Sequence, residues 1–349
     1  EVDPQEEIEI EQEKAVEAQD PGVEVTPNED GSVEVNFDPS KVNIEGQPGH
    51  FDNLAELLPE DVLKPIGLEL VGNYKEYKTG RKDWEQAYIQ GLDLLGFKYE
   101  NRTEPFQGAS GATHPVLAEA VTQFQAGAYK ELLPAEGPVR TQIVGKPDPA
   151  KEAQSQRVKD YMNYEIMNNM TDYEPDFDQL LFYLPLAGSA FKKVYYDPIM
   201  ERPCAMFVPA EDFVVSYGAS DLMTCERYTH VMKKSANDIA KLQDNGFYRD
   251  IELPEPEPDM SDIQEKYDEL DGESATIEDD DRHTLLEMHV EMEMPEPFNE
   301  EDGIARPYVI TIDKSSRTIL SIRRNYYEDD KKKRKRQYFV HYRYLPGLG

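Results

Sequence analysis

The sequence has few cysteines and no long apolar run, and each shortage excludes a class of protein. Its two cysteines, Cys204 and Cys225, are too few among 349 residues for a disulfide framework, which indicates a reducing compartment. No apolar run approaches the roughly 20 residues that a membrane-spanning helix needs. No basic segment precedes an apolar one near the N-terminus, so no signal peptide is visible. We therefore expect a protein without a membrane partner.

Basic residues are also scarce. The chain has 37 lysines and arginines against 71 aspartates and glutamates, which gives a formal net charge of -34. DNA-binding domains gain most of their affinity from phosphate neutralisation, so the field of the whole chain repels nucleic acid. Such a field is compatible with DNA that passes without adhering, and equally with acidity that only keeps the protein soluble.

Sequence signatures of catalysis are missing as well. Neither a P-loop nor a G-x-G-x-x-G dinucleotide-binding motif occurs. Ser110 lies in the sequence Gly-Ala-Ser-Gly, which lacks the G-x-S-x-G pattern and the preceding strand of a nucleophile elbow and is typical of a tight glycine turn. We therefore predict that the chain is not an enzyme and binds no cofactor.

One cluster of potential metal ligands leaves an alternative open. It comprises His283, Glu287, His289, Glu291 and Glu293. In a strand, the members from 287 to 293 share one face and the apolar residues from 286 to 294 share the other, which predicts an amphipathic strand with a solvated face. The spacing matches no known zinc-ligand pattern, so we predict no metal site. The alternative is a metal-dependent hydrolase that uses the carboxylates near His289.

The chain does contain enough aromatic surface for a folded core. Aromatic residues make up 10% of the sequence, with 21 tyrosines and 13 phenylalanines, and such rings bury enough area to offset chain entropy. Residues 1–50 differ, because they are mostly acidic or polar, and predict a flexible arm. Within this arm, apolar and polar residues alternate on both sides of Asp30-Gly31, which predicts a β-hairpin.

The hydrophobic period changes near Ala190. Before this residue, apolar side chains recur at helical spacing, in a pattern over 51–70 that Pro59 and Pro65 interrupt and in helices over 84–95, 115–133, 148–170 and 176–187. After it, the period of two predicts strands over 190–196, 204–208, 213–215, 226–232, 284–294, 307–313, 318–323 and 338–344, with one helix over 235–243. We predict an α+β fold in which N-terminal helices precede a mainly antiparallel β region.

A second acidic, proline-rich segment interrupts the β region at 251–282. Its composition predicts a mostly unstructured surface insertion. The chain therefore divides into the arm, 1–50, and one folded region, 51–349, that contains the insertion. The first residue is Glu1 rather than Met and the last four are Pro-Gly-Leu-Gly, so we expect the gene product to be longer.

One dense basic cluster stands out against the acidic background. It is the run Lys331, Lys332, Lys333, Arg334, Lys335 and Arg336, which follows three acidic residues. Such a run can contact DNA phosphates or an acidic neighbouring subunit, and it is also typical of a solvated loop between strands. We treat these six residues as a candidate nucleic-acid or subunit contact. We favour the subunit or solvent interpretation.

Six blocks of sequence form a pattern spread along the folded region. They are TGRKDWEQAYIQGLDLLGFKYE (79–100), PFQGASGATHPVLAEAVTQFQAGAYKELLPAEGPVRTQIVG (105–145), LPLAGSAFKKVYYDP (184–198), RPCAMFVPAEDFVV (202–215), RPYVITIDKSSRTILSIRRNYY (306–327) and YFVHYRYLPGLG (338–349). Together they resemble the portal proteins of short-tailed and related bacteriophages, over about residues 50–349. The arm and the insertion match no part of that pattern.

The resemblance implies a structural protein with a portal wing-like fold. A portal is a ring of twelve subunits at one capsid vertex, with a peripheral wing, a helical stem that lines the channel and a clip that meets the terminase motor and later the tail. The chain resembles the N-terminal, wing-containing half. We therefore expect a virion protein, assembled in the host cytoplasm, that forms the passage for packaging and ejection of double-stranded DNA. Its expected partners are copies of itself, the major capsid protein, scaffold, terminase large subunit and tail adaptor.

Overall fold

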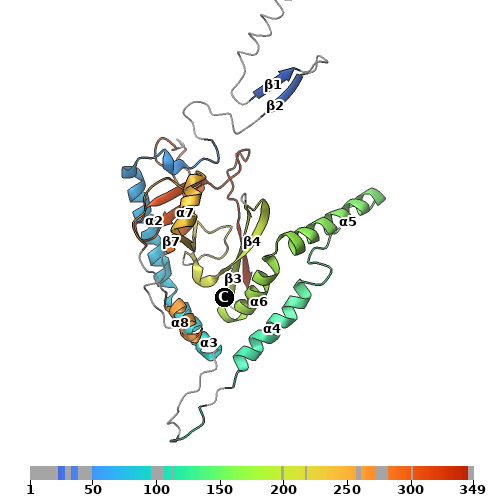
Figure 1. Ribbon diagram of the computed structural model, residues 1–349, viewed down its shortest axis with the longest axis vertical. Helices are drawn as coiled ribbons and strands as arrows, with labels where there is room; N and C mark the ends of the chain where they lie inside the picture. Colours follow the sequence, from blue (N-terminus) through green and yellow to red (C-terminus); the bar gives the residue numbers. More distant parts are fainter. Residues whose placement is uncertain are drawn as a thin grey trace, which may run out of the picture.

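Helices precede strands along most of the chain, and the predicted α+β class is confirmed (Figure 1). The computed structural model describes residues 23–27, 33–37, 49–95, 106–111, 114–197, 200–216, 218–256, 261–271, 282–299 and 302–344. Its α-helices are α2 (Glu60–Gly80), α3 (Lys82–Leu95), α4 (Val116–Leu132), α5 (Pro149–Tyr164), α6 (Tyr173–Ala187), α7 (Ala236–Asp244) and α8 (Asp262–Asp271). A π-helix over Glu165–Asn169 continues α5.

The strands form three antiparallel sheets, as the period of two predicts. The predicted hairpin of the arm pairs β1 (Val23–Pro27) with β2 (Val33–Phe37); the rest of 1–48 lies outside the described residues, so the flexible arm stays a prediction. A three-stranded sheet has the order β10-β3-β4, with β3 (Ser189–Asp197), β4 (Arg202–Pro209) and β10 (Phe339–Arg343). A five-stranded sheet follows chain order, with β5 (Phe213–Val215), β6 (Arg227–Ser235), β7 (Arg282–Met292), β8 (Arg306–Asp313) and β9 (Ile319–Arg324).

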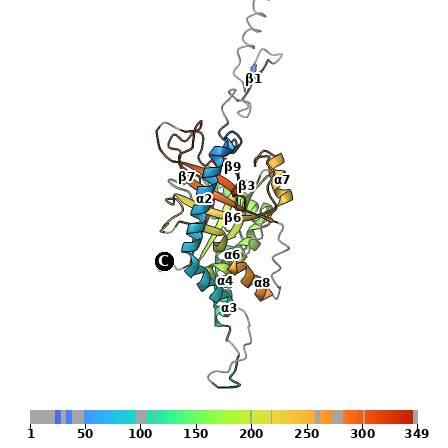
Figure 2. The same cartoon turned by 90° about the vertical axis from the view of Figure 1, so that its left-hand side faces the viewer.

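Helix α2 covers one face of the five-stranded sheet (Figure 2). Its buried residues recur at helical spacing and are Leu63, Gly67, Leu70, Val71 and Tyr74. They pack against the even-numbered apolar residues of β7 and against β8 and β9. The predicted interruption at Pro65 is wrong, because α2 continues through it. Pro65 lies on the exposed side of the helix, where water can satisfy the carbonyl group that the missing N–H leaves unpaired.

The opposite side of this sheet meets the three-stranded sheet. Phe339 of β10 is fully buried there, with its ring centre 5.7 Å from that of Tyr228 and 4.9 Å from that of Phe213. Helices α3, α4 and α6 complete this second core from outside. Helix α7 covers a smaller third core against β7 and β9. The helix predicted over 235–243 is confirmed as α7, and Ser235 caps its N-terminus, since Ser235 Oγ accepts from the Asp238 amide at 3.1 Å.

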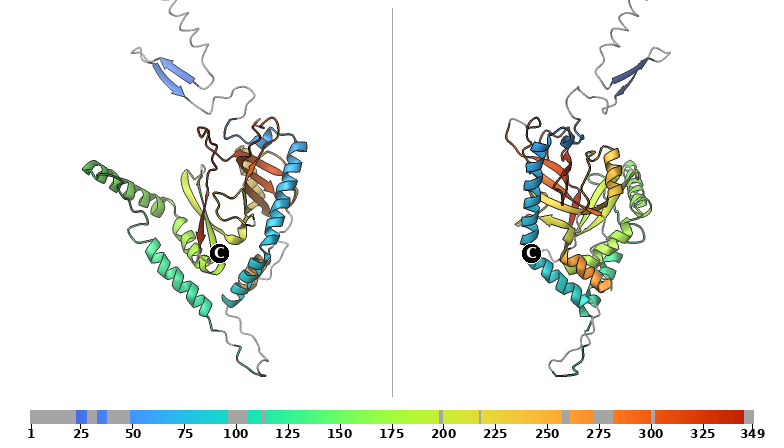
Figure 3. Two further views of the ribbon diagram at one scale, coloured as in Figure 1. Left: turned by 180° about the vertical axis from the view of Figure 1, so that it is seen from behind. Right: turned by 60° about the vertical axis from the view of Figure 1, so that its left-hand side comes forward.

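The segment 251–282 is more ordered than its composition predicts. Helix α8 lies within it and packs beside α3 (Figure 3). Ile263 of α8 is buried, and Tyr267 places its hydroxyl against that of Tyr88 on α3. The acidic composition hid an apolar stripe at i, i+4 and i+7, formed by Ile263, Tyr267 and Leu270. Residues 257–260 and 272–281 lie outside the described residues.

Helices α4 and α5 extend away from the sheets, and α5 reaches the edge of the molecule (Figures 1 and 3).

Both cysteines are buried and free. Across the described residues, the structure contains no helix of the length and apolar character that crossing a bilayer requires.

The two glycines at the sheet side and the outer side of α2 provide a matched test of this packing. A Cβ at Gly67 would lie 2.4 Å from the Arg317 carbonyl oxygen, whereas a Cβ at Gly72 would meet nothing within 4 Å. We expect Gly67→Ala to lower the free energy of unfolding by about 1–3 kcal/mol, because the new methyl group forces α2 away from the Arg317 carbonyl. Gly72→Ala should raise it by about 0.5–1 kcal/mol, because alanine favours a helix. Urea denaturation measures both, and equal effects would contradict the packing described.

Candidate functional site

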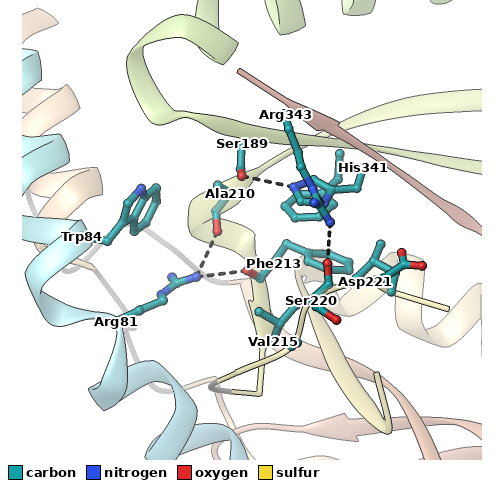
Figure 4. Close-up of a pocket in the computed structure, with 13 residues that line it drawn as sticks. Arg81, Trp84, Ser189, Ala210, Phe213, Val215, Ser220, Asp221, His341 and Arg343 are labelled. Atoms are coloured by element: carbon teal, nitrogen blue, oxygen red, sulfur yellow. Dashed lines mark hydrogen bonds between the residues drawn. The ribbon is translucent and has the colours of Figure 1, made fainter. Parts of the chain in front are cut away.

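The break between α2 and α3 ties the helices to the strand region (Figure 4). Arg81 donates to the backbone carbonyls of Ala210 at 2.9 Å and Phe213 at 3.1 Å. Trp84 donates through Nε1 to the carbonyl of Ala187 at 3.1 Å, and the Arg81 guanidinium lies 5.4 Å from the Trp84 ring centre. Each of these two side chains therefore joins the α2–α3 break to a segment more than 100 residues later in the sequence.

A cavity of about 300 Å³ opens beside this junction. Its apolar wall includes Trp84, Phe191 and Phe213, and its polar wall includes His341 and Arg343 of β10 (Figure 4). Arg343 donates through Nη2 to the Ser220 carbonyl at 2.6 Å, so this cation is held by the wall. The lining is suited to an aromatic or aliphatic group with a polar edge.

The serine–histidine pair in this cavity has the wrong tautomer for a nucleophile and its base. His341 Nε2 lies 3.1 Å from Ser189 Oγ, while its Nδ1 faces Arg343 Nε at 3.2 Å. A guanidinium N–H can only donate, so Nδ1 accepts and Nε2 carries the proton. His341 therefore donates to Ser189 and cannot take its proton. Burial and the Arg343 charge lower the pKa of His341 to about 4, which keeps the ring neutral.

Of the residues predicted to form a solvated face on β7, Glu291 and Glu293 are exposed, but Glu287 and His289 are largely buried, so the prediction is wrong for these two. Glu287 accepts from Lys193 of β3 at 2.5 Å and lies 3.1 Å from His289, which is 2% exposed. Strand β7 is the middle strand of five, and β3 and β10 cover its second face. Burial alone would raise the pKa of Glu287, but the Lys193 ammonium and the His289 ring hold it well below its usual range.

The other members of the potential metal cluster lie apart. His283 is 3.5 Å from Asp313, and Glu291 is 3.7 Å from Lys335. Glu293 lies beyond the end of β7 and is exposed. Within the described part of the chain, no three His, Cys, Asp or Glu side chains form a group that could hold a metal ion.

Two buried groups have no counterpart in the sequence-based prediction. Lys192 is 2% exposed, and its ammonium lies 4.0 Å from the Tyr173 ring centre, where burial lowers its pKa to about 8. Glu211 accepts from the Tyr183 hydroxyl at 2.6 Å, and burial raises its pKa to about 7. Both follow strongly apolar segments, which is the one signal in the sequence that they face a core.

The basic run forms the loop before β10, and the structure divides it. Lys335 is 9% exposed, and its ammonium donates to the Cys225 carbonyl at 2.5 Å. Arg336 stacks its guanidinium 4.6 Å from the Tyr327 ring centre. Lys331, Lys332 and Arg334 are exposed, although Arg334 pairs with Asp330 at 2.9 Å. The exposed part of the run therefore provides three cations rather than six.

No protein-family model matches the chain, and no curated protein sequence matches it significantly.

Breaking the buried ion pair should be costly, and removing it entirely should not. Glu287→Gln leaves the Lys193 ammonium buried without a counter-charge, so we expect the free energy of unfolding to fall by about 3–5 kcal/mol. The double variant Lys193→Met/Glu287→Leu removes both charges and should recover most of that loss. Urea denaturation of the single and double variants measures the difference. Additive losses would contradict a direct pair.

Acid should destabilise the protein through the buried histidines. Burial lowers the pKa of His230 from 6.5 to about 3. Below pH 6.5 the unfolded chain therefore binds a proton at His230 that the folded chain does not. The free energy of unfolding consequently decreases as the pH is lowered. As the pH is lowered from 6 to 4, we expect the free energy of unfolding of the wild type to decrease by about 1.4 kcal/mol per pH unit more than that of His230→Gln. Urea titrations at several pH values test this, and parallel slopes would contradict it.

Proposed function

We propose that the chain is a structural subunit of the portal ring of a tailed bacteriophage. In this role it forms part of the passage for double-stranded DNA at one capsid vertex, in a ring of subunits with the wing, stem and clip that the family resemblance implies. The proposed partners are further copies of the chain, the major capsid protein, scaffold, terminase large subunit and tail adaptor. The proposed location is the virion.

The observation that carries this proposal is the way the resembling blocks meet. Arg81 and Trp84 belong to the block 79–100. Trp84 bonds to Ala187 in the block 184–198, and Arg81 bonds to Ala210 and Phe213 in the block 202–215. Segments of three separate blocks thus share one junction, so the resembling blocks belong to one folded unit.

The division of the basic run bears on DNA contact. Lys335 and Arg336 hold the loop against the fold, through the Cys225 carbonyl and the Tyr327 ring. Lys333 lies 5.7 Å from the Tyr326 ring centre, and the exposed cations are Lys331, Lys332 and Arg334, of which Arg334 already pairs with Asp330. Three cations on a chain of net charge -34 give weak phosphate binding that salt screens readily. We propose that this loop contacts a neighbouring subunit or solvent rather than holding DNA.

Particle mass and DNA packaging test the two parts of this proposal. We expect the purified protein to sediment as a large ring, visible by negative-stain electron microscopy. In the variant Lys331→Gln/Lys332→Gln/Arg334→Gln, packaging per assembled ring should match the wild type, because the loop does not hold DNA. A protein that stays monomeric at micromolar concentration would contradict the ring.

A matched variant separates the two halves of the loop. Lys335→Gln removes a buried ammonium and leaves the Cys225 carbonyl without its donor, so it should lower the free energy of unfolding by about 1–3 kcal/mol. The triple variant changes exposed side chains and should leave stability unchanged. Normal rings that fail to package DNA in the triple variant would show that the loop does contact DNA.

A further inference from the structure

Helix α5 exposes the apolar stripe that its sequence would bury. Val158, Tyr161 and Met162 recur at i, i+3 and i+4 and are 43%, 64% and 44% exposed. The chain covers a different side of the helix, where Asn163 accepts from the Val139 amide at 2.9 Å. A helix with an uncovered apolar stripe is typical of one that binds another surface. Helix α5 reaches beyond the sheets (Figure 1).

The same side of α5 is basic. Lys151 precedes Val158 by seven residues and Arg157 precedes Tyr161 by four, so both flank the stripe. The two acidic residues of α5, Glu152 and Asp160, lie on other sides of the helix by the same spacing, whereas Glu165, just after α5, lies on the side of the stripe and hydrogen-bonds the Tyr161 hydroxyl. Among α2 to α8, α5 alone has more basic than acidic residues. An acidic partner surface therefore fits it, and a second copy of this acidic chain provides one.

A complementary surface lies on the other side of the molecule. Asp262, Glu265 and Glu269 of α8 recur at i, i+3 and i+7 and are exposed, facing away from the buried Ile263, and Glu269 also pairs with Lys266 of the same helix at 2.7 Å. Leu94 on the adjoining α3 is 59% exposed and adds an apolar contact. The front and rear views place the α3–α8 pair and α5 on opposite sides of the sheets (Figures 1 and 3).

We propose that α5 of one copy docks on the α3–α8 surface of the next copy. The apolar stripe of α5 would lie against Leu94, and Lys151 and Arg157 would face the acidic row of α8. Because the two surfaces differ and lie on opposite sides, the contact is head-to-tail, the type that forms a ring when the rotation from copy to copy closes. This inference rests on the proposed ring function and assigns the surfaces that join its subunits.

Charge reversal and its rescue test the contact in the whole protein. We expect Lys151→Glu/Arg157→Glu to raise the concentration needed for half-assembly about tenfold or more, and Glu265→Lys/Glu269→Lys to do the same. All four changes in one chain should restore assembly, because charges of opposite sign again face each other. The control Lys64→Glu/Lys241→Glu makes the same charge change on α2 and α7 and should assemble normally. Unchanged thermal unfolding midpoints would show that each variant folds.

Crosslinking locates the contact directly. Photo-reactive benzoylphenylalanine in place of Tyr161, in a mixture of isotopically light and heavy copies, should link unlike copies at residues 93–95 or 262–271. This inference would be overturned by rings that form equally well with the reversed charges, or by crosslinks to any other surface or another protein. Either result would leave the proposed ring function standing. A wild-type protein that never assembles would overturn both the inference and the proposed ring.

Discussion

The structure depends on the packing of the three-stranded sheet against the five-stranded sheet. Phe339 occupies the centre of this contact, fully buried, and its ring meets those of Tyr228 and His289. It lies opposite Lys193 in the register of β10 and β3, so both side chains face the same way. The position of β10 in turn fixes where the basic loop ends. The cavity wall at His341 and Arg343 follows from the same strand.

Charge burial at this contact limits how the sheets can be arranged. Lys193 faces the five-stranded sheet and bonds Glu287, whereas its neighbour Lys192 faces α6 and lies over the Tyr173 ring. A shift of β3 by one residue would exchange the two lysines and leave Glu287 without its counter-charge. Buried ion pairs contribute little net stability compared with apolar packing. Here the pair selects one register, because every other register would leave an unpaired charge in the core.

Periodicity was sufficient to predict most elements and insufficient wherever a second layer covers them. The apolar stripes of α3, α4 and α6 and the alternation in β8 and β9 predicted those elements from local sequence alone. The same rule failed at Glu287 and His289, since alternation indicates a solvated face only when nothing packs on it. The stripe of α8 was hidden by acidic residues on its outer side. The junction at Arg81 involves carbonyl groups, which no side-chain pattern reveals.

The placement of α2 has a consequence for synthesis of the chain on the ribosome. Asn53, just before α2, bonds the Leu320 carbonyl, 267 residues later in sequence. At about 5–20 residues per second, roughly 13 to 50 seconds separate the emergence of the two. The strands β6 to β9 are consecutive neighbours and can pair as soon as they emerge. Until those strands have emerged and paired, the apolar side of α2 has no sheet to cover it.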